Sequence, residues 1–370
     1  MTLRILHVTT IREWRGGDAQ MYMLYNQLQA LDDFDQWILC PSNSELAARC
    51  AADGAQHVTY ARTRFKLFNA VRAIVSACRR HDIGIVHAHD SSALTACLLA
   101  MRVLPRTRLV FSRKRNNPIG NNVLSRRKYA SPRIAGIVAV SDIAASVLHG
   151  VVDPRRIRTL YGAVDVEGIA ALGRDGRLQR AFGIAPATRV VGNLAGYTAQ
   201  KELATFLHAA AAILRDKPAE MPVHFVLVGE GPQRPELERL AGELGIADRV
   251  VFAGFRTDAV ALLSEFDLLM MSSRTEGLPI AAYEAFAAGV PVVATAAGGT
   301  REAVFHGRTG LVVEPGDSEG LARHALEVLT DPALAGRLRA EALALVRTRH
   351  TREAFRDRYR DFYEQIAAAG

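Results

Sequence analysis

Two glutamates in the second half of the chain flank a predicted helix start. Glu276 closely follows a predicted strand, and Pro279 suits the first helical position because it has no N–H to lose. The amides around Gly277 and Leu278 would then point out of a helix N-terminus, which favours phosphate binding. Glu284 lies five residues beyond Pro279, roughly 7.5 Å further along the axis. This offset is similar to the step from the diphosphate of a nucleotide to its ribose.

The two carboxylates match the two ends of a sugar nucleotide. A carboxylate only accepts hydrogen bonds, so Glu284 would take two hydroxyls of a ribose diol. Glu276, on the other side of the phosphates, would take hydroxyls of an attached sugar. The spacing alone also fits a capped helix with two surface glutamates, because helix N-termini attract acidic side chains.

Short β-type runs alternate with helical runs along the whole chain. Strands are predicted at residues 4–9, 36–39, 57–60, 83–88, 108–112, 136–140, 157–160, 190–194, 223–228, 250–252, 268–272, 291–294 and 310–313. Helices are predicted at residues 19–31, 67–81, 91–102, 201–215, 235–244, 259–266, 279–288 and 318–329, and from about 351 to 367. This α/β pattern predicts two doubly wound, Rossmann-like domains with a cleft between them. Ligands in such sheets bind beyond the carboxyl ends of the strands.

The domain boundaries follow from length and composition. A chain of 370 residues usually forms more than one core. The charged stretch from Gly173 to Arg180 marks the expected boundary, with domains at residues 1–172 and 181–350. Residues 351–370 form a separate final helix whose aromatic side chains recur at three- and four-residue spacing along one stripe.

The motifs together resemble glycosyltransferase family 4. The most specific stretch is TEGLP at residues 275–279, continued by EAFAAGVPVVAT at 284–295. Weaker motifs follow the family order over nearly the whole chain: Gly16-Gly17, then VHAHD at 86–90, VAVS at 138–141, YGAVD at 161–165, VGEGP at 228–232 and FAGF at 252–255. The resemblance implies a retaining enzyme of GT-B fold, similar to bacterial cell-surface glycan and lipopolysaccharide glycosyltransferases. The N-terminal domain would bind the acceptor, the C-terminal domain the donor, and the last helix would return to the N-terminal domain.

The resemblance also implies roles for individual residues. Glu276 would contact the donor sugar, Glu284 the ribose, and Lys201 the diphosphate, whose growing charge it would neutralise as it departs. His89 resembles a histidine near the transferred sugar; a strand-end histidine bonded to backbone would look the same. The expected catalytic residues are His89, Lys201 and Glu276. The expected donor-binding residues are Gly16, Gly17, Gly196, Lys201, Gly254, Phe255, Glu276, Gly277, Leu278, Pro279 and Glu284.

The chain departs from the family pattern just before Lys201. The family often has an arginine there on the phosphates, and residues 193–200 contain none. Glu202 also replaces a frequent glycine. Another basic residue, Arg274 or Arg113, would have to compensate, or stabilisation of the leaving group is weaker.

Basic residues are concentrated in the first half of the chain. Residues 104–133 contain nine basic residues and no acidic one. Such a field suggests an anionic partner, although an arginine-rich solvated surface would look the same. We expect Arg113, Lys114 and Arg115 to bind an anionic acceptor, such as a phosphorylated lipopolysaccharide core or a lipid-linked glycan. A cytoplasmic protein is expected, with peripheral contact at the inner face of the membrane, because no apolar run is long enough to span a bilayer.

The expected function is metal-independent transfer of a hexose from a nucleotide-diphosphate sugar, UDP by family frequency, to a glycan or glycolipid of the cell envelope. The nucleotide sugar is a co-substrate and no cofactor is expected. There is no Asp-x-Asp motif and no His/Cys cluster at ligand spacing. The first strand lacks the Gly-x-Gly-x-x-Gly turn of nicotinamide enzymes, and no nucleic-acid motif appears. A sugar-nucleotide epimerase of the same shape and a catalytically inactive relative that binds anionic ligands are the alternatives.

Overall fold

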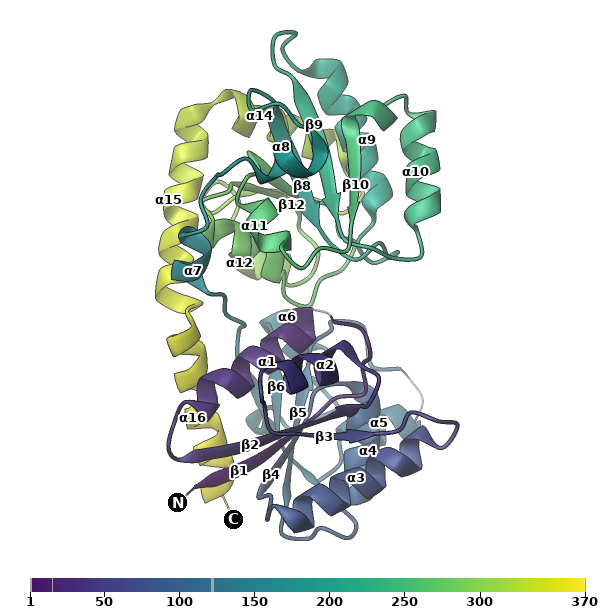
Figure 1. Ribbon diagram of the computed structural model, residues 1–370. Helices are drawn as coiled ribbons and strands as arrows, with labels where there is room; N and C mark the ends of the chain where they lie inside the picture. The colour runs from purple at the N-terminus through teal and green to yellow at the C-terminus, as the bar shows by residue number, and fades with distance from the viewer. Residues whose placement is uncertain (1, 15, 121–122, 370) are drawn as a thin grey trace. The chain divides into compact units, whose positions relative to one another are not determined.

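The computed structural model describes residues 2–14, 16–120 and 123–369. The chain divides into two compact units (Figure 1). The first comprises residues 1–162 together with 352–370, and the second residues 163–351. The last helix, α16 (Arg352–Ala368), therefore belongs to the same unit as the N-terminus.

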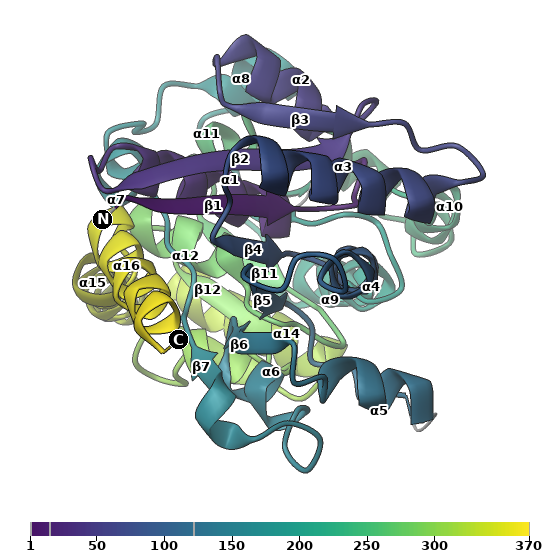
Figure 2. The same cartoon turned by 90° about the horizontal axis from the view of Figure 1, so that it is seen from below.

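The first unit is built on a seven-stranded parallel sheet with the order β3-β2-β1-β4-β5-β6-β7 (Figure 2). The order reverses between β1 and β4, as in a doubly wound Rossmann-like sheet. Its strands are β1 (Leu3–Val8), β2 (Phe34–Pro41), β3 (His57–Tyr60), β4 (Ile85–Ala88), β5 (Arg108–Arg113), β6 (Ile134–Ala139) and β7 (Ile157–Thr159). Its helices include α1 (Gly16–Gln29), α2 (Glu45–Ala52), α3 (Lys66–Arg80), α4 (Ser91–Ala100), α5 (Val123–Tyr129) and α6 (Asp142–Ser146).

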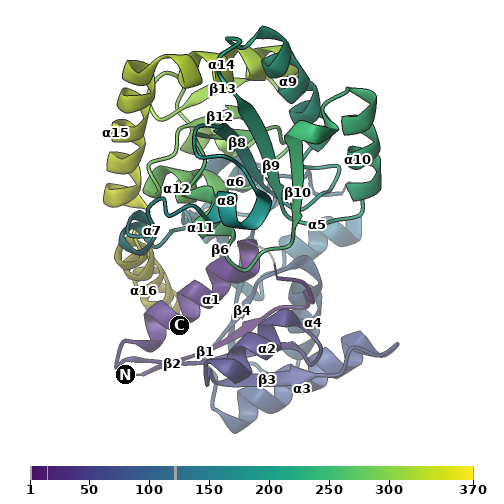
Figure 3. The same cartoon turned by 45° about the horizontal axis from the view of Figure 1, so that its top comes forward.

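The second unit repeats this scheme with a six-stranded parallel sheet, β10-β9-β8-β11-β12-β13 (Figure 3). Its strands are β8 (Arg189–Leu194), β9 (Val223–Val228), β10 (Val250–Gly254), β11 (Leu268–Met271), β12 (Val292–Thr295) and β13 (Leu311–Val313). Its helices include α7 (Val166–Ala170), α8 (Arg177–Phe182), α9 (Leu203–Asp216), α10 (Arg234–Glu243), α11 (Ala259–Leu263), α12 (Ile280–Ala287), α13 (Thr300–Ala303), α14 (Ser318–Thr330) and α15 (Pro332–Arg349). The strands are buried apolar runs because helices cover both faces of such a sheet.

The boundary between the units differs from the sequence-based expectation, which placed it at residues 173–180. In the structure, the chain passes from the first unit into the second after Gly162. Val164, Val166 and Ile169 are buried in the core of the second unit, so this segment is fixed there by its apolar side chains.

The charged stretch 173–180 is not a linker because two buried acids fasten it to the second unit. The carboxylate of Glu265 accepts from the backbone N–H of Arg177 at 2.6 Å and of Leu178 at 3.0 Å. Arg174 pairs with Asp267 at 3.3 Å. The polar residues that suggested a linker therefore hold this segment to the second unit through hydrogen bonds and an ion pair.

Most predicted elements form close to their expected bounds, but several helices lie where none was assigned, and one predicted helix starts differently. The 18-residue helix α15 lies where none was assigned, and Asp331 caps it by accepting from the backbone N–H groups of Ala333 and Leu334, both at 2.9 Å. Pro279 is the N-cap of α12 rather than its first residue, because its ψ of 82° is not helical. No helix in the described ranges is long and apolar enough to cross a membrane.

Candidate functional site

Lys201 and Glu276, far apart in sequence, form an ion pair in the second unit. Lys201 Nζ lies 2.5 Å from Glu276 Oε1, and the Glu276 side chain is 5% exposed. Ser273 Oγ donates to the same carboxylate oxygen at 2.7 Å. Two of the three predicted catalytic residues are therefore neighbours, and a cation stands beside the carboxylate expected to hold a sugar.

The loops at the carboxyl ends of β8 and β11 hold this pair through backbone contacts. The Arg274 N–H donates to the Gln200 carbonyl at 2.9 Å, and Gln200 Nε2 donates to the Thr275 carbonyl at 2.9 Å. Ser272 Oγ donates to the Lys201 carbonyl at 3.1 Å. Because the strands are parallel, both loops emerge at the same sheet edge, where ligands of such sheets bind.

The backbone of Glu276 is held from the next strand. The Gly299 N–H donates to the Glu276 carbonyl at 2.9 Å, and Thr295 Oγ1 donates to the Ser273 carbonyl at 2.5 Å. Three consecutive strand ends in the sheet, those of β8, β11 and β12, thus contribute to one preorganised turn. Within this turn, Gly277 is buried and Leu278 is half-buried.

Glu284 lies on α12, five residues after Pro279, the residue that caps the helix. Its side chain makes no hydrogen bond or ion pair within the described part of the chain. Burial raises the pKa of Glu284 to about 7. An unpaired, partly desolvated carboxylate has its full accepting capacity left for a ligand, which fits the hydroxyl-binding role expected of it.

Glycines bring three loops of the second unit into close backbone contact. A Cβ on Gly229 would lie 1.9 Å from the Ala195 carbonyl oxygen, and one on Gly231 would lie 2.4 Å from the Tyr197 carbonyl oxygen. The Gly229 N–H donates to the Gly254 carbonyl at 2.9 Å. The weak motif at residues 228–232 therefore packs against the loop that contains Gly196.

Phe255 follows the end of β10 and is 60% exposed. Gly254 has a φ of 70°, which glycine adopts without strain, and turns the chain there. An exposed aromatic ring beside glycine-rich strand ends offers a flat apolar surface of the kind on which a base stacks.

Glu202, the residue in place of the family glycine, has a positive φ of 47° at the start of α9. The left-handed conformation is unfavourable for a side chain with a Cβ, which explains why glycine is frequent here. Arg274 donates to Glu202 through Nε at 3.1 Å and also through Nη2. Arg274, one of the two residues expected to compensate for the missing arginine, is thus held by the glutamate and is 72% exposed.

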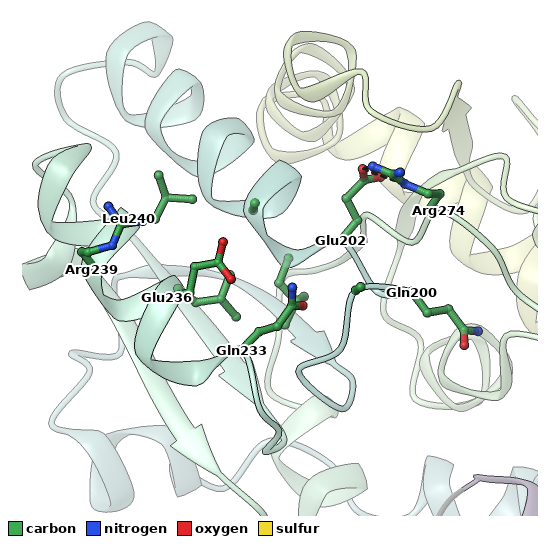
Figure 4. Close-up of a pocket in the computed structure, with 11 residues that line it drawn as sticks. Gln200, Glu202, Gln233, Glu236, Arg239, Leu240 and Arg274 are labelled. Atoms are coloured by element: carbon green, nitrogen blue, oxygen red, sulfur yellow. Dashed lines mark hydrogen bonds and ion pairs between the residues drawn. The ribbon is translucent and has the colours of Figure 1, made fainter.

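A pocket of about 510 Å³ is lined in part by this ion pair (Figure 4). It is lined by Ala199, Gln200, Glu202, Leu203, Ala204, Gln233, Glu236, Leu237, Arg239, Leu240 and Arg274. Lys201, Glu276 and Glu284 do not line it, so we assign the site to the strand-end turn and not to this pocket.

In the first unit, the two glycines that begin α1 lie beside Lys114, which directly follows β5. Lys114 Nζ donates to the Gly17 carbonyl at 2.8 Å. A Cβ on Gly17 would lie 3.1 Å from Lys114 Cδ, so the glycine makes room for the lysine side chain. A Cβ on Gly16 would meet no atom of the described residues within 4 Å, so its side of the backbone is open to a ligand.

The three basic residues predicted to bind an acceptor do not share one surface. Arg113 is buried beneath Tyr129, with its guanidinium 5.7 Å from the ring centre, and donates to the Asn117 carbonyl. Burial lowers the pKa of Arg113. Lys114 donates a hydrogen bond to the Gly17 carbonyl, and Arg115 is exposed.

His89 is buried beside two other histidines of the first unit. His7 Nδ1 lies 2.9 Å from His89 Nε2, and the His87 and His89 ring centres are 4.0 Å apart. One ring nitrogen of each lies within 4.8 Å of the others. Sequence reasoning missed His7 because β1 and β4, the strands that bring it beside His87 and His89, are distant in the sequence. The available signal was that all three histidines lie at or near the carboxyl ends of predicted strands.

Two family descriptions match consecutive parts of the chain. "Glycosyltransferase Family 4" matches residues 14–167, and "Glycosyl transferases group 1" matches residues 186–331. The matched ranges together span most of both units.

Curated relatives are glycosyltransferases or related synthases. N-acetyl-alpha-D-glucosaminyl L-malate synthase of Bacillus anthracis is 26% identical over 303 residues, 79% of this chain and 77% of the relative. Lipopolysaccharide core biosynthesis glycosyltransferase LpsD of Rhizobium meliloti is 39% identical over 142 residues, 38% of this chain and 41% of the relative. The second match thus spans less than half the length of that relative.

Solved structures share the fold over the whole chain. Anabaena Alr3699/HepE in complex with UDP and glucose superposes with a TM-score of 0.84 at 19% identity, covering 98% of this chain and 100% of that one. Sucrose-phosphate synthase from Thermosynechococcus elongatus gives a TM-score of 0.81 at 17% identity, covering all of both chains.

Proposed function

Because the chain belongs to the family 4-like glycosyltransferases of GT-B fold, we propose that it transfers a hexose from a UDP-sugar to a glycolipid of the cell envelope, with retention of anomeric configuration. The observation that carries the proposal is the Lys201–Glu276 ion pair beside the glycine-rich strand ends of the second unit. The donor diphosphate would replace Glu276 as the partner of Lys201, which frees the carboxylate for sugar hydroxyls.

The chemistry requires stabilisation of a departing diphosphate. Negative charge grows on the leaving group in the transition state, and a preorganised cation counters it. Lys201 supplies this cation, and the amides of Gly277 and Leu278 before α12 add hydrogen-bond donors. We propose a metal-independent reaction in which the departing phosphate helps to take the acceptor proton, so that no enzyme nucleophile is needed.

A nucleotide donor is supported by the chemistry of two side chains, and the choice of UDP by related structures. Phe255 offers a ring for base stacking, and Glu284 an acceptor for the ribose diol. Structures of Anabaena Alr3699/HepE contain UDP, UDP with glucose, or UDP-glucose.

The donor assignment is tested by thermal stabilisation with a panel of UDP-, GDP- and ADP-sugars. A ligand that binds the native state raises the melting temperature. We expect UDP-sugars to stabilise the protein and Glu284→Ala to abolish the effect. Glu220→Ala, which removes an exposed glutamate of the same unit, is the matched control and should respond like the parent. No response to any nucleotide sugar would contradict the proposal.

The acceptor side is supported by a basic and apolar surface on the first unit. Phe65 and Phe68 at the start of α3 are 58% and 67% exposed, and Lys66 lies between them. Residues 54–81 contain six basic residues and no acidic one. Exposed aromatic rings among cations are typical of proteins that dock on anionic lipid surfaces. We propose that this surface holds the enzyme at a membrane that carries its acceptor.

Membrane docking is tested by co-sedimentation with vesicles. Vesicles with anionic lipid should bind the protein, and binding should weaken at high salt because charge attraction is screened. Phe65→Ala/Phe68→Ala should reduce binding strongly, whereas Phe255→Ala, which removes an equally exposed ring from the other unit, should not. Equal loss in both variants would refute the surface.

A further inference from the structure

His7, Gln36 and His89 form a buried hydrogen-bonded chain in the first unit. Gln36 Oε1 lies 2.9 Å from His7 Nε2, and His7 Nδ1 lies 2.9 Å from His89 Nε2. All three residues are buried: His7 and Gln36 are fully inaccessible and His89 is 4% exposed. A polar chain so isolated from water must have a definite donor and acceptor at every link.

The contacts of Gln36 determine which atom donates and which accepts in each of these hydrogen bonds. Gln36 Nε2 donates to the Tyr25 carbonyl at 3.0 Å, and a carbonyl can only accept. The amide oxygen of Gln36 therefore faces His7, whose Nε2 must carry the hydrogen. Burial lowers the pKa of His7 to about 4, so the ring is neutral near pH 7 and its Nδ1 is an acceptor.

The tautomer of His7 determines the tautomer of His89. Because His7 Nδ1 accepts, His89 Nε2 must donate to it. Burial also keeps the pKa of His89 well below its ordinary value, so this ring is neutral. Its Nδ1 is buried and has no hydrogen-bond partner among the residues that the structure describes. Leaving a buried acceptor unpaired is destabilising, so a ligand that donates a hydrogen bond would be favoured there.

We propose that Gln36 and His7 are positioning residues that hold His89 in the Nε2–H tautomer, so that Nδ1 accepts a hydrogen bond from a hydroxyl of the sugar substrate. Only the nature of the ligand rests on the proposed function; the tautomer follows from the protein contacts. His89 is suitably placed, since it directly follows β4 and its N–H is held by the Val8 carbonyl at 2.9 Å.

The three histidines are less suited to a metal. Each ligating histidine must offer a lone pair to the ion. Both nitrogens of His87 are engaged, Nδ1 with the Tyr363 hydroxyl at 2.6 Å and Nε2 with Ser112 Oγ at 2.7 Å. Both nitrogens of His7 are also engaged, Nδ1 with His89 and Nε2 with Gln36. Among the described residues of this cluster, His89 Nδ1 is thus the one ring nitrogen with a free lone pair.

The direct test is NMR of the full-length protein with ¹⁵N-labelled histidine, whose two-bond correlations distinguish the neutral tautomers. We expect both His7 and His89 to carry the hydrogen on Nε2. An Nδ1–H tautomer of His89 would overturn the proposal. Stoichiometric Zn²⁺ added to the same sample should leave these signals unchanged; a shift of all three histidines would identify a metal site and also overturn it.

Two variants of Gln36 test the positioning role. Gln36→Leu removes the acceptor for His7, which should free His7 to reverse and convert His89 to the Nδ1–H form. Gln36→Glu, kept protonated by burial at about pH 6, would still donate to the Tyr25 carbonyl and accept from His7, and should keep the parent tautomer. Gln29→Leu removes the neighbouring amide, 3.4 Å from Gln36, and is the matched control.

Activity gives the second readout. Gln36→Leu should lower kcat/KM by about tenfold, as for loss of one hydrogen bond, while Gln36→Glu and Gln29→Leu stay near the parent. An unchanged His89 tautomer in Gln36→Leu would refute the relay. If the parent protein transfers no sugar, the proposed function fails, whereas the NMR results still decide the relay.

Discussion

At the scale of single residues, the Lys201–Glu276 pair should contribute to stability as well as to donor binding. Lys201→Ala leaves a buried carboxylate with Ser273 as its remaining side-chain partner, which should cost about 1–3 kcal/mol. The double variant Lys201→Ala/Glu276→Ala should lose less than the sum of the single variants, with a coupling of about 1–2 kcal/mol from urea unfolding. The exposed pair Arg239–Glu243 is the control, and its coupling should stay below about 0.5 kcal/mol. Equal couplings would contradict the special environment of Glu276.

Glu284 should make the stability of the protein depend on pH. Its pKa is raised from the ordinary 4.5 to about 7, so the native state keeps a proton that the unfolded chain loses between these values. Stability should therefore fall as pH rises from about 4.5 to 7. Glu284→Gln removes this loss and should be more stable than the parent by on the order of 1–3 kcal/mol at pH 8, with little difference at pH 4. Chemical denaturation at several pH values measures the difference, and a constant difference across this range would contradict the assignment.

The same titration should affect nucleotide binding in the opposite direction. Ribose hydroxyls are accepted best by the ionised carboxylate, so the affinity for a UDP-sugar should increase as pH rises through about 7. Isothermal calorimetry at pH 6 and pH 8 checks this, with Glu284→Gln as a variant whose affinity should change little. The unpaired carboxylate thus lowers stability at neutral pH while keeping its accepting oxygens available to a ligand.

At the scale of elements, the turn after β9 should tolerate no side chain. Gly229 has a φ of 145°, and a Cβ there would lie 1.9 Å from the Ala195 carbonyl oxygen. Gly229→Ala should destabilise the second unit by about 3 kcal/mol or more, through strain and displacement of the loop that contains Gly196. Gly242→Ala in α10, where a Cβ meets nothing within 4 Å among the described residues, should stabilise by about 0.5–1 kcal/mol. Thermal unfolding measures both, and a neutral Gly229→Ala would refute the close packing.

At the scale of the whole molecule, the last helix should stabilise the unit that contains the N-terminus. Phe362 of α16 is buried, and a Cβ on Gly136 of β6 would lie 2.9 Å from its ring. Phe362→Ala should cost about 3–5 kcal/mol. Hydrogen exchange should rise in peptides from residues 1–162 and not in those from residues 181–330. Phe206→Ala, which empties the core of the second unit, should give the reverse pattern. Exchange that rises throughout the chain in both variants would show that the units unfold together.

Sequence patterning determined the fold class because each local signal is short-ranged. Apolar runs of strand length separated by amphipathic segments impose parallel sheets, and the structure has a strand at each predicted location. The stretch around Glu276 and Glu284 identified the family for a similar reason, since the residues of the turn and of α12 are consecutive. Composition was a poorer guide to the boundary, because a charged segment can be a linker or, as with Arg174 and Arg177, a bonded attachment.

Only the tertiary structure decided which distant residues share an environment. The pairing of Lys201 with Glu276 depends on the order of β8 and β11 in the sheet, and the burial of Arg113 beneath Tyr129 depends on how α5 packs. The relay from Gln36 through His7 to His89 joins three strands whose separation along the chain hides their contact. Residue types and spacing specify local conformation, whereas protonation, hydrogen-bond direction and ion pairing follow from burial and from neighbours that folding brings together.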